Sequence, residues 1–462
     1  MTYAFSFDAS SCSGCKACQE ACKDKNNLPV GVIWRRVIEV SGGEWYRTGG
    51  SWENNVFAYH LSLACNHCRY PKCAGVCPTD AFSVRADGVV LLDSSKCMGC
   101  GYCAWACPYG APQYNASKGV MTKCDFCYDN LDTGQPPACV SACPLRVLDF
   151  EPTEDPDDKK KSLIALWKIP ANEHPFPLAS YSRTEPRLSN KRHPGMDSAL
   201  GKTVANFEEI QTKTGGKLFE NPAFNELPLV AFTLLLQMAV GMTICLLAVL
   251  HNPLSILFDI GLVAGIGGLA SFLHLGRKRN AWRALNHLKK SWLSRETLLT
   301  CLFATAWLVT FGLEWFLKVT ITFLPMALIG CGLIYSMAQI YRLRTVEAWN
   351  SWRTPVTFFL SAVVLGTLGV NINIPASSWE IIAGIAMAVE LCLVLEEQSL
   401  KFNSTRKWRI ISIAIGLLGI FFLDIFPRAG GSWSDVAVFL IALAAETIGR
   451  QQFYARRIPN PL

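Results

Sequence analysis

Histidine is scarce in this sequence, with 7 residues in a chain of 462. A haem held by two histidines inside a helical bundle needs that pair on facing helices. No two histidines in the apolar part of the chain have such a spacing. We therefore expect the chain to bind no haem.

The start of the chain lacks the features of a secretory signal peptide. Residues 1–11 have neither a basic start nor an apolar core of the required length. Arg35 and Arg36 are adjacent, but no apolar stretch follows them, so they do not form a twin-arginine export signal. We expect no export signal in this part of the sequence.

The formal net charge of +7 would suit nucleic-acid binding if the basic residues formed one surface. In the second half of the chain they lie instead between long apolar runs, where they act as topology signals. We expect no nucleic-acid partner.

Hydropathy divides the chain into three expected parts. Residues 1–150 are polar and rich in glycine and cysteine. Residues 151–226 open on the charged stretch EPTEDPDDKKK and continue with many prolines, which predicts a linker that cannot fold alone. Residues 227–462 are predicted to form a membrane domain with these apolar segments of spanning length: 227–250, 254–275, 297–317, 321–341, 355–374, 379–395, 409–426 and 433–448.

Sixteen of the 20 cysteines fall in four groups of four within the first 143 residues. The first and third groups have the spacing C-x2-C-x2-C-x3-C, in which three thiolates hold one 4Fe-4S cluster and the fourth reaches a second cluster. Two such groups make two clusters, so four groups predict four. The groups are Cys12, Cys15, Cys18, Cys22; Cys65, Cys68, Cys73, Cys77; Cys97, Cys100, Cys103, Cys107; and Cys124, Cys127, Cys139, Cys143.

Two other uses of cysteine fit this pattern less well. Structural zinc accepts four thiolates, but its ligands usually come as two well-separated pairs and not as runs of three. Disulfide frameworks belong to small secreted chains. The sequence thus predicts an α+β ferredoxin-like four-cluster iron-sulfur domain followed by an all-α eight-helix transmembrane bundle.

The residues also carry a resemblance that covers nearly the whole chain. FSFDASSCSGCKACQEACKDKNNLP and KCMGCGYCAWACPYGAPQYN resemble the four-cluster iron-sulfur subunit of the dimethyl sulfoxide reductase family of complex iron-sulfur molybdoenzymes. NELPLVAFT, HLGRKRNAWRALNHLKKSWLSRE, WNSWRTPVTFF and AETIGRQQFY resemble the eight-helix membrane anchor of that family. The two subunits are usually separate polypeptides, so this sequence departs from the pattern by fusing them.

The family pattern pairs the first cysteine group with the fourth and the second with the third. It implies four ligand sets, which we number one to four: Cys12, Cys15, Cys18 and Cys143; Cys22, Cys124, Cys127 and Cys139; Cys65, Cys68, Cys73 and Cys107; and Cys77, Cys97, Cys100 and Cys103. Set four is expected nearest the membrane. Related nitrate reductases carry tryptophan and a three-iron cluster at the position of Cys100, so the cysteine here implies four 4Fe-4S clusters.

The resemblance further implies a separate molybdenum-bis-pterin catalytic subunit, because no molybdopterin site is recognisable in this chain. Electrons would then pass between that partner and menaquinone or ubiquinone in the membrane. Two other interpretations stay open: the same route run in reverse for sulfite oxidation, and a quinone-linked module of a complex without molybdenum.

His274 and Glu296 are the candidate quinone-binding residues. Both are expected at the end of the bundle that faces the cluster domain, where quinol chemistry needs groups that exchange protons. The family places its quinol site around the matching histidine and glutamate. The alternative is a histidine that meets lipid headgroups and a glutamate that favours a helix dipole.

Further acidic residues lie inside or at the edge of the apolar segments: Asp259, Glu314, Glu390, Asp424 and Glu446. Glu446 is followed four residues later by Arg450, which predicts an ion pair along one helix face. Glu390 has no basic residue nearby in the sequence and is a candidate for proton transfer.

The basic residues predict which side of the inner membrane holds the iron-sulfur domain of this multi-pass protein. An even number of spans returns the C-terminus to the side of the cluster domain, and the connections on that side, at 277–295, 342–353, 401–409 and 450–457, are rich in Lys and Arg. The opposite face offers Lys318 and Arg428. Short basic loops are retained in the cytoplasm, so we predict a cytoplasmic iron-sulfur domain. Family analogy alone points to the periplasm.

Overall fold

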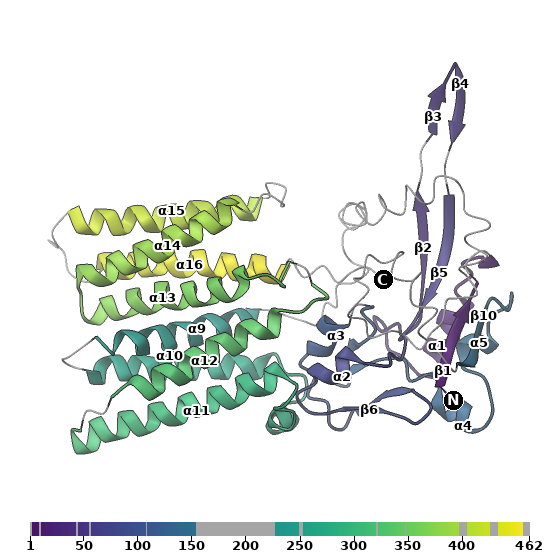
Figure 1. Cartoon of the computed structure of the whole chain (residues 1–462), viewed down its shortest axis with the longest axis horizontal. Coiled ribbons are helices and arrows are strands. Elements are labelled where there is room, and N and C mark those ends of the chain that lie inside the picture. The colour runs from purple at the N-terminus through teal and green to yellow at the C-terminus, as the bar shows by residue number, and fades with distance from the viewer. Residues whose placement is uncertain are drawn as a thin grey trace. The chain divides into compact units, whose positions relative to one another are not determined.

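The computed structural model describes residues 2–153 and 227–455, except positions 9–10, 43–44, 55–56, 108, 249–252, 320–321, 347, 397–403 and 426–432. These residues belong to two compact units; the described part of the first ends at 153 and that of the second begins at 227 (Figure 1). Nearly all of the predicted linker lies outside the described residues.

The first unit contains five two-stranded antiparallel sheets in its described residues. The strand β1 (Thr2–Phe7) pairs with β10 (Leu148–Thr153), which places Phe7 opposite Leu148 and joins the start of the unit to its end. The other pairs are β2 (Arg36–Gly42) with β5 (Phe57–Leu63), β3 (Trp45–Thr48) with β4 (Ser51–Asn54), β6 (Phe82–Val84) with β7 (Val90–Leu92), and β8 (Gln113–Asn115) with β9 (Val120–Thr122).

Short helices follow the cysteine loops. They are α1 (Ala17–Lys25), α2 (Lys72–Val76), α3 (Tyr102–Ala106), α4 (Tyr128–Asp132) and α5 (Ala138–Ser141). The residues directly before α1, α3 and α4 are Lys16, Gly101 and Cys127, and each has a left-handed backbone conformation. Such residues reverse the chain sharply, so consecutive cysteines of one loop can face the same point.

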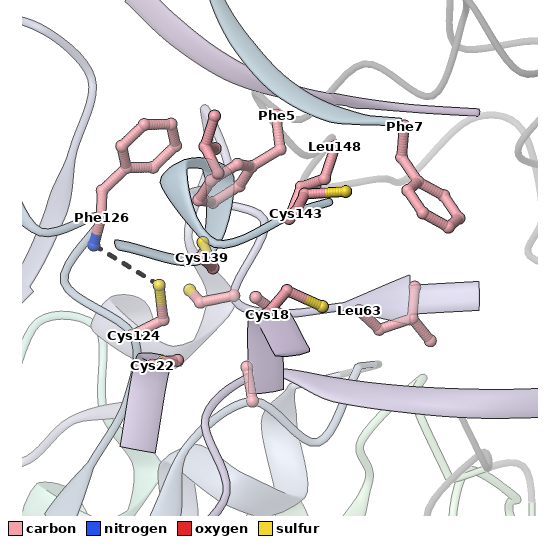
Figure 2. Close-up of a cluster of buried hydrophobic side chains, with 14 of the residues drawn as sticks. Phe5, Phe7, Cys18, Cys22, Leu63, Cys124, Phe126, Cys139, Cys143 and Leu148 are labelled. Carbon is pink, nitrogen blue, oxygen red and sulfur yellow. Dashed lines mark hydrogen bonds between the residues drawn. The ribbon is translucent and has the colours of Figure 1, made fainter. Parts of the chain in front are cut away.

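The core of the first unit is built from aromatic and aliphatic residues mixed with cysteine. Phe5 stacks on Phe126 with a ring-centroid distance of 4.1 Å, and Phe7 and Leu148 are both buried. Figure 2 shows several cysteines gathered among these side chains. The sulfur atoms therefore lie in surroundings from which much of the water is excluded.

The second unit is all-helical apart from its connections. Its eight long helices are α9 (Leu227–Cys245), α10 (Pro253–Leu273), α11 (Trp292–Gly312), α12 (Leu324–Tyr341), α13 (Arg353–Asn373), α14 (Ser377–Glu396), α15 (Ser404–Ile425) and α16 (Trp433–Ala455). A 3-10 helix, η2 (Lys278–Leu285), precedes α11, and a π-helical turn, η3 (Leu313–Leu317), extends it. The connections 274–291 and 342–352 lie at the same end of this unit (Figure 1).

Seven of these helices are long and apolar enough to cross a membrane. The helix α15 is not among these seven. Only described residues were considered, and the side chains of residues 404–406 and 421–425 in α15 are not described. The predicted fold class is confirmed: a small strand-containing domain precedes an all-helical membrane region, with a helix count close to that expected.

Glycines allow two of the helices to approach closely. A Cβ atom on Gly241 of α9 would lie 1.9 Å from the carbonyl oxygen of Ala362 in α13, and one on Gly366 would lie 2.4 Å from the carbonyl carbon of Gly241. Close backbone contact through small residues is a common way to pack membrane helices, since burial away from lipid contributes no hydrophobic gain. Packing is therefore the role of Gly366.

The predicted start of the third segment is wrong. The helix begins at Trp292 and not at residue 297, because the polar sequence SRE occupies its first turns rather than the connection before it. Glu296 thus lies inside α11 and is buried, with 4% of its surface exposed.

Candidate functional site

The four cysteines of set one line a small cavity in the first unit, together with Phe7, Val37 and Leu148. Three of these cysteines come from the loop and helix after β1. Cys143 comes from the segment just before β10, and the pairing of β1 with β10 brings it alongside. A hydrogen bond from the Asp8 amide to the Val147 carbonyl, at 2.8 Å, extends this pairing beyond the strands.

Helix α1 carries one cysteine for set one and another for set two. Cys18 and Cys22 are separated by four residues, about one turn of helix, and both are buried. The pKa of Cys22 is raised to about 12, mainly by burial and then by the neighbouring thiol of Cys139. A free thiolate is therefore disfavoured at this site, and a soft metal is the partner that would stabilise it.

Sets two, three and four each converge in the structure. In set two, the pKa of Cys124 is raised mainly by burial and next by the thiol of Cys22. The pKa of Cys127 is raised to about 11, mainly by burial and also by the thiol of Cys139. The pKa of Cys68 is raised by burial and then by Cys65, Cys107 and Cys73. The pKa of Cys100 is raised by burial and, among the thiols, by Cys77 and Cys97. For each of these four thiols, the neighbouring thiol that acts most strongly belongs to the same set.

Single cysteines also connect each set to the next. Burial raises the pKa of Cys18, and Cys139 of set two is one of the thiols that adds to this effect. Cys124 of set two has Cys65 of set three as a neighbour. Cys103 of set four has Cys73 of set three as a neighbour. The four sets therefore follow one another in the order one, two, three, four.

Backbone amides donate hydrogen bonds to sulfur in three of the sets. The Phe126 amide donates to Cys124 Sγ at 3.4 Å, as Figure 2 shows, and the Gly99 amide donates to Cys97 Sγ at 3.4 Å. The Ala111 amide donates to Cys107 Sγ at 3.5 Å. Such bonds stabilise negative charge on sulfur and are one of the means by which a protein sets the reduction potential of an iron-sulfur cluster.

Two buried cations lie among the cysteines, and sequence reasoning missed both. Arg35 is 1% exposed; its Nη1 donates to Ser62 Oγ at 3.1 Å, and that hydroxyl lies 3.4 Å from Cys18 Sγ. Lys123 is 4% exposed and donates to the carbonyl oxygens of Val90 and Cys124. Since a buried cation is costly without nearby negative charge, both residues indicate an anionic group in this interior.

The residues of the first unit thus fit iron-sulfur clusters. Set one lines a cavity, thiols of the other three sets have neighbours within their own sets, and amides and cations are positioned to balance the charge of thiolates. Among the described residues, no three His, Cys, Asp or Glu side chains lie close enough to hold one metal ion.

The predicted quinone residues both lie in the second unit. His274 directly follows α10, and its buried Nδ1 atom makes no hydrogen bond of the usual geometry within the described residues. Glu296 is buried in α11 and interacts electrostatically with the hydroxyl groups of Tyr341 and Tyr454. His274 is the first residue of the connection 274–291, and Glu296 lies in α11, which follows that connection. No hydrogen bond joins the two among the described residues.

The two acidic residues within the apolar segments have partners other than those expected. Glu390 pairs with Arg409 of α15, with 2.7 Å between Oε1 and Nη2. Glu446 accepts a hydrogen bond from Ser361 Oγ at 2.7 Å, and within the described part of the chain it forms no ion pair with Arg450. Arg450 donates instead to Gln237 Oε1 at 2.9 Å. Residues distant in sequence provide these partners, so local spacing could not predict them.

Comparison with known proteins agrees with this arrangement. A family model described as a 4Fe-4S dicluster domain matches residues 56–153, and one described as DMSO reductase anchor subunit (DmsC) matches residues 221–397. One chain of the anaerobic dimethyl sulfoxide reductase of Escherichia coli (strain K12) is 51% identical over 168 residues, which cover 36% of this chain and 82% of the relative. This chain belongs to the dimethyl sulfoxide reductase family. It is a fused iron-sulfur and anchor subunit.

More distant relatives also match this fused subunit over about a third of its length. The formate dehydrogenase iron-sulfur subunit of Wolinella succinogenes is 39% identical over 166 residues, covering 31% of this chain and 78% of the relative. One subunit of the sulfite dehydrogenase of Allochromatium vinosum is 36% identical over 174 residues, covering 33% and 69%. The fused subunit is therefore a multi-pass membrane protein with a 4Fe-4S domain, related to subunits of oxidoreductase complexes.

Proposed function

We propose that this subunit carries electrons between the quinone pool and a separate molybdenum-bis-pterin catalytic subunit. Four 4Fe-4S clusters, when bound, would supply one-electron steps between them. The cysteine sets hold them, the sulfur-directed amides and the buried cations set their charge balance, and His274 and Glu296 bind the quinone. The continuous order of the four sets in the first unit is the observation that carries this proposal.

The reduction of a sulfoxide or amine oxide is the activity that the relatives favour most. The matching part of the Escherichia coli dimethyl sulfoxide reductase shares 51% identity with this chain, against 36% for the sulfite dehydrogenase subunit. Electrons would then run from quinol through set four toward set one and on to the partner. Sulfite oxidation, with electrons running the other way, is the second candidate because a sulfite dehydrogenase subunit also matches this chain.

Metal analysis of the native complex tests the identity of the partner. The full chain, tagged at its C-terminus, is purified from its own membranes in mild detergent together with whatever it binds. We expect about one molybdenum or tungsten and two pterins per chain, besides about sixteen iron atoms for four clusters. A complex that contains several haems and no molybdenum or tungsten would contradict the proposal and support the module without molybdenum.

Substrate assays of that complex distinguish the two directions. A reductase oxidises quinol when a sulfoxide or an amine oxide is added, whereas a sulfite-oxidising complex reduces quinone when sulfite is added. Either result identifies the direction of electron flow in the same subunit.

We also propose that the first unit lies on the cytoplasmic side of the inner membrane. The basic connections of the second unit support this, since Lys and Arg are retained on the cytoplasmic side. A catalytic partner bound to the clusters would then also be cytoplasmic.

A further inference from the structure

A polar cavity lies in the second unit and is lined by α13, α14, α15 and α16. It is bounded by Ser351 and Arg353 where α13 begins, and it reaches Ser361 within the same helix. Arg353 and Ser361 are eight positions apart in α13, which corresponds to about 12 Å of helix. The cavity thus extends from one end of the bundle into its interior.

Two carboxyl groups and two guanidinium groups meet at the inner part of this cavity. Glu390 and Glu446 are 2% and 4% exposed, and Arg450 is 5% exposed. Arg409 holds Glu390 at 2.7 Å, and Ser361 holds Glu446 at 2.7 Å. Ionisable groups at this depth of a membrane bundle are expensive and usually serve transport or proton transfer.

The two carboxyl groups also contact each other. Glu390 lies within hydrogen-bond reach of Glu446, although both groups are acceptors when ionised. Two carboxylates in such contact repel each other in a medium of low dielectric constant, and one proton shared between them would relieve this repulsion. The pair is therefore built to bind and release a single proton.

A line of buried polar groups leads from this pair to Glu296. Arg450 of α16 donates to Ser361 Oγ at 3.4 Å, beside Glu446, and Tyr454 lies one helical turn beyond it. The Tyr454 hydroxyl donates to the Tyr341 hydroxyl at 2.7 Å, and both tyrosines interact electrostatically with Glu296. Both rings are almost fully buried. The polar groups therefore continue between the cavity and the proposed quinone residue.

We propose that Glu390 and Glu446 form a proton-exchange site that connects the cavity to the quinone site through Tyr454 and Tyr341. The proposal rests on the proposed function of Glu296 at that site. Reduction of one quinone takes two electrons from the iron-sulfur clusters and two protons from the protein. Those protons come from water in the cavity and pass through the carboxyl pair one at a time. Oxidation of quinol returns two electrons and two protons along the same routes.

Groups on every helix around the pair would influence its proton. Arg353 and Ser361 lie on α13, Arg409 on α15, and Arg450 on α16, while Gln237 reaches Arg450 from α9. Arg353 also pairs with Glu396 of α14 at 3.0 Å, near the start of the cavity. A purely structural ion network would use the same contacts, so the test needs a readout of proton transfer.

The test follows how fast quinone reoxidises the clusters in the full-length protein. Chemically reduced protein in detergent is mixed with a soluble quinone, and cluster absorbance is recorded in H2O and in D2O across a range of pH. Glu446→Gln and Tyr454→Phe should each slow reoxidation by at least about tenfold, since positioned proton transfer usually contributes that much or more. Both should increase the solvent isotope effect, and formate or azide should restore part of the rate of Glu446→Gln.

Glu380→Gln is the matched control. Glu380 is another buried glutamate of α14, 2% exposed, but it accepts a hydrogen bond from Asn371 at 3.0 Å and does not line the cavity. This variant should reoxidise at the normal rate with a normal isotope effect.

The outcomes separate the two proposals. If quinone reoxidises the clusters of the unaltered protein while Glu446→Gln and Tyr454→Phe keep the normal rate and isotope effect, the proton-exchange site is wrong and the quinone function stands. The site is also wrong if the variants lose folded protein or thermal stability but keep the normal rate per reduced cluster. If quinone fails to reoxidise the clusters of the unaltered protein, the proposed quinone function itself is wrong.

Discussion

Arg35 shows how one side chain can serve two cysteine sets. Its guanidinium group lies 4.3 Å from the centroid of the Phe5 ring and acts electrostatically on Cys18 of set one and on Cys22 of set two. A cation in this position stabilises the more negative, reduced form of a nearby cluster. It should therefore raise the reduction potential of both neighbours.

Arg35→Met should lower the midpoint potential of at least one cluster by roughly tens of millivolts, because it removes a buried charge while keeping much of the side-chain volume. Redox titration followed by electron paramagnetic resonance measures this. Arg47→Met, in the exposed strand β3, is the control and should change no potential. Unaltered potentials in the Arg35 variant, with normal iron content, would show that the cation does not act on the clusters.

Cys100 decides whether set four holds four irons. Its thiol has Cys77 and Cys97 as neighbours, and burial raises its pKa. Cys100→Ser should reduce the iron content or convert one cluster to a three-iron form, and quinone should then fail to reoxidise the remaining clusters. Chemical dyes should still do so. Iron analysis and electron paramagnetic resonance provide the measurement, and a three-iron signal in the unaltered protein would contradict the prediction.

Among the structural elements, the antiparallel pairing of β1 with β10 does most to assemble the candidate site. The sequence predicted which cysteines share a set only through the family resemblance, because the spacing within each group cannot show which distant group folds against it. The pairing register of Phe7 with Leu148 is a tertiary fact, and it places Cys143 at the cavity of set one.

In the second unit, too, the local sequence predicts the helices, whereas contacts between distant residues could not be predicted from it. Long apolar runs were enough to predict the helices, because a spanning helix needs about twenty apolar residues and little else. The pairing of Glu390 with Arg409 was not predictable from sequence spacing, since the two residues belong to different helices and lie 19 positions apart. The start of α11 was predicted too late in the sequence because its first turns contain polar residues.

Gly366 tests the close crossing of α9 and α13. Gly366→Leu forces the two helices apart, because a Cβ atom at this position would lie 2.4 Å from the carbonyl carbon of Gly241. We expect lower yield and a melting temperature reduced by several degrees, in line with overpacking costs of about 1–3 kcal/mol. Gly265→Leu is the control because a Cβ atom there meets open space. Equal stability of the two variants would contradict the described crossing.

For the whole molecule, fusion places a 4Fe-4S domain and a membrane anchor in one chain at a fixed ratio of one to one. The relatives that match the first part cover only about a third of this chain, so the anchor lies beyond the matched stretch. A single chain therefore carries both ends of the proposed electron route, which simplifies experiments on the isolated protein.

A C-terminal reporter tests the predicted side of the membrane. The prediction requires all eight long helices to span the membrane, which would return the C-terminus to the side of the first unit. A fused green fluorescent protein should then fluoresce, and a fused alkaline phosphatase should stay inactive. The same reporters placed in the connection between α11 and α12 should give the opposite result. Active phosphatase at the C-terminus without fluorescence would place the first unit outside the cytoplasm.

The reoxidation of reduced clusters by quinone tests the central claim most directly. The full-length chain, purified without oxygen, is reduced with dithionite, freed of excess reductant and mixed with a menaquinone or ubiquinone analogue while cluster absorbance is followed. We predict that quinone reoxidises the clusters of the unaltered protein and that His274→Ala and Glu296→Gln each slow this reaction at least about tenfold with unchanged iron content. Clusters that stay reduced in the presence of quinone, while a chemical dye oxidises them, would contradict the account.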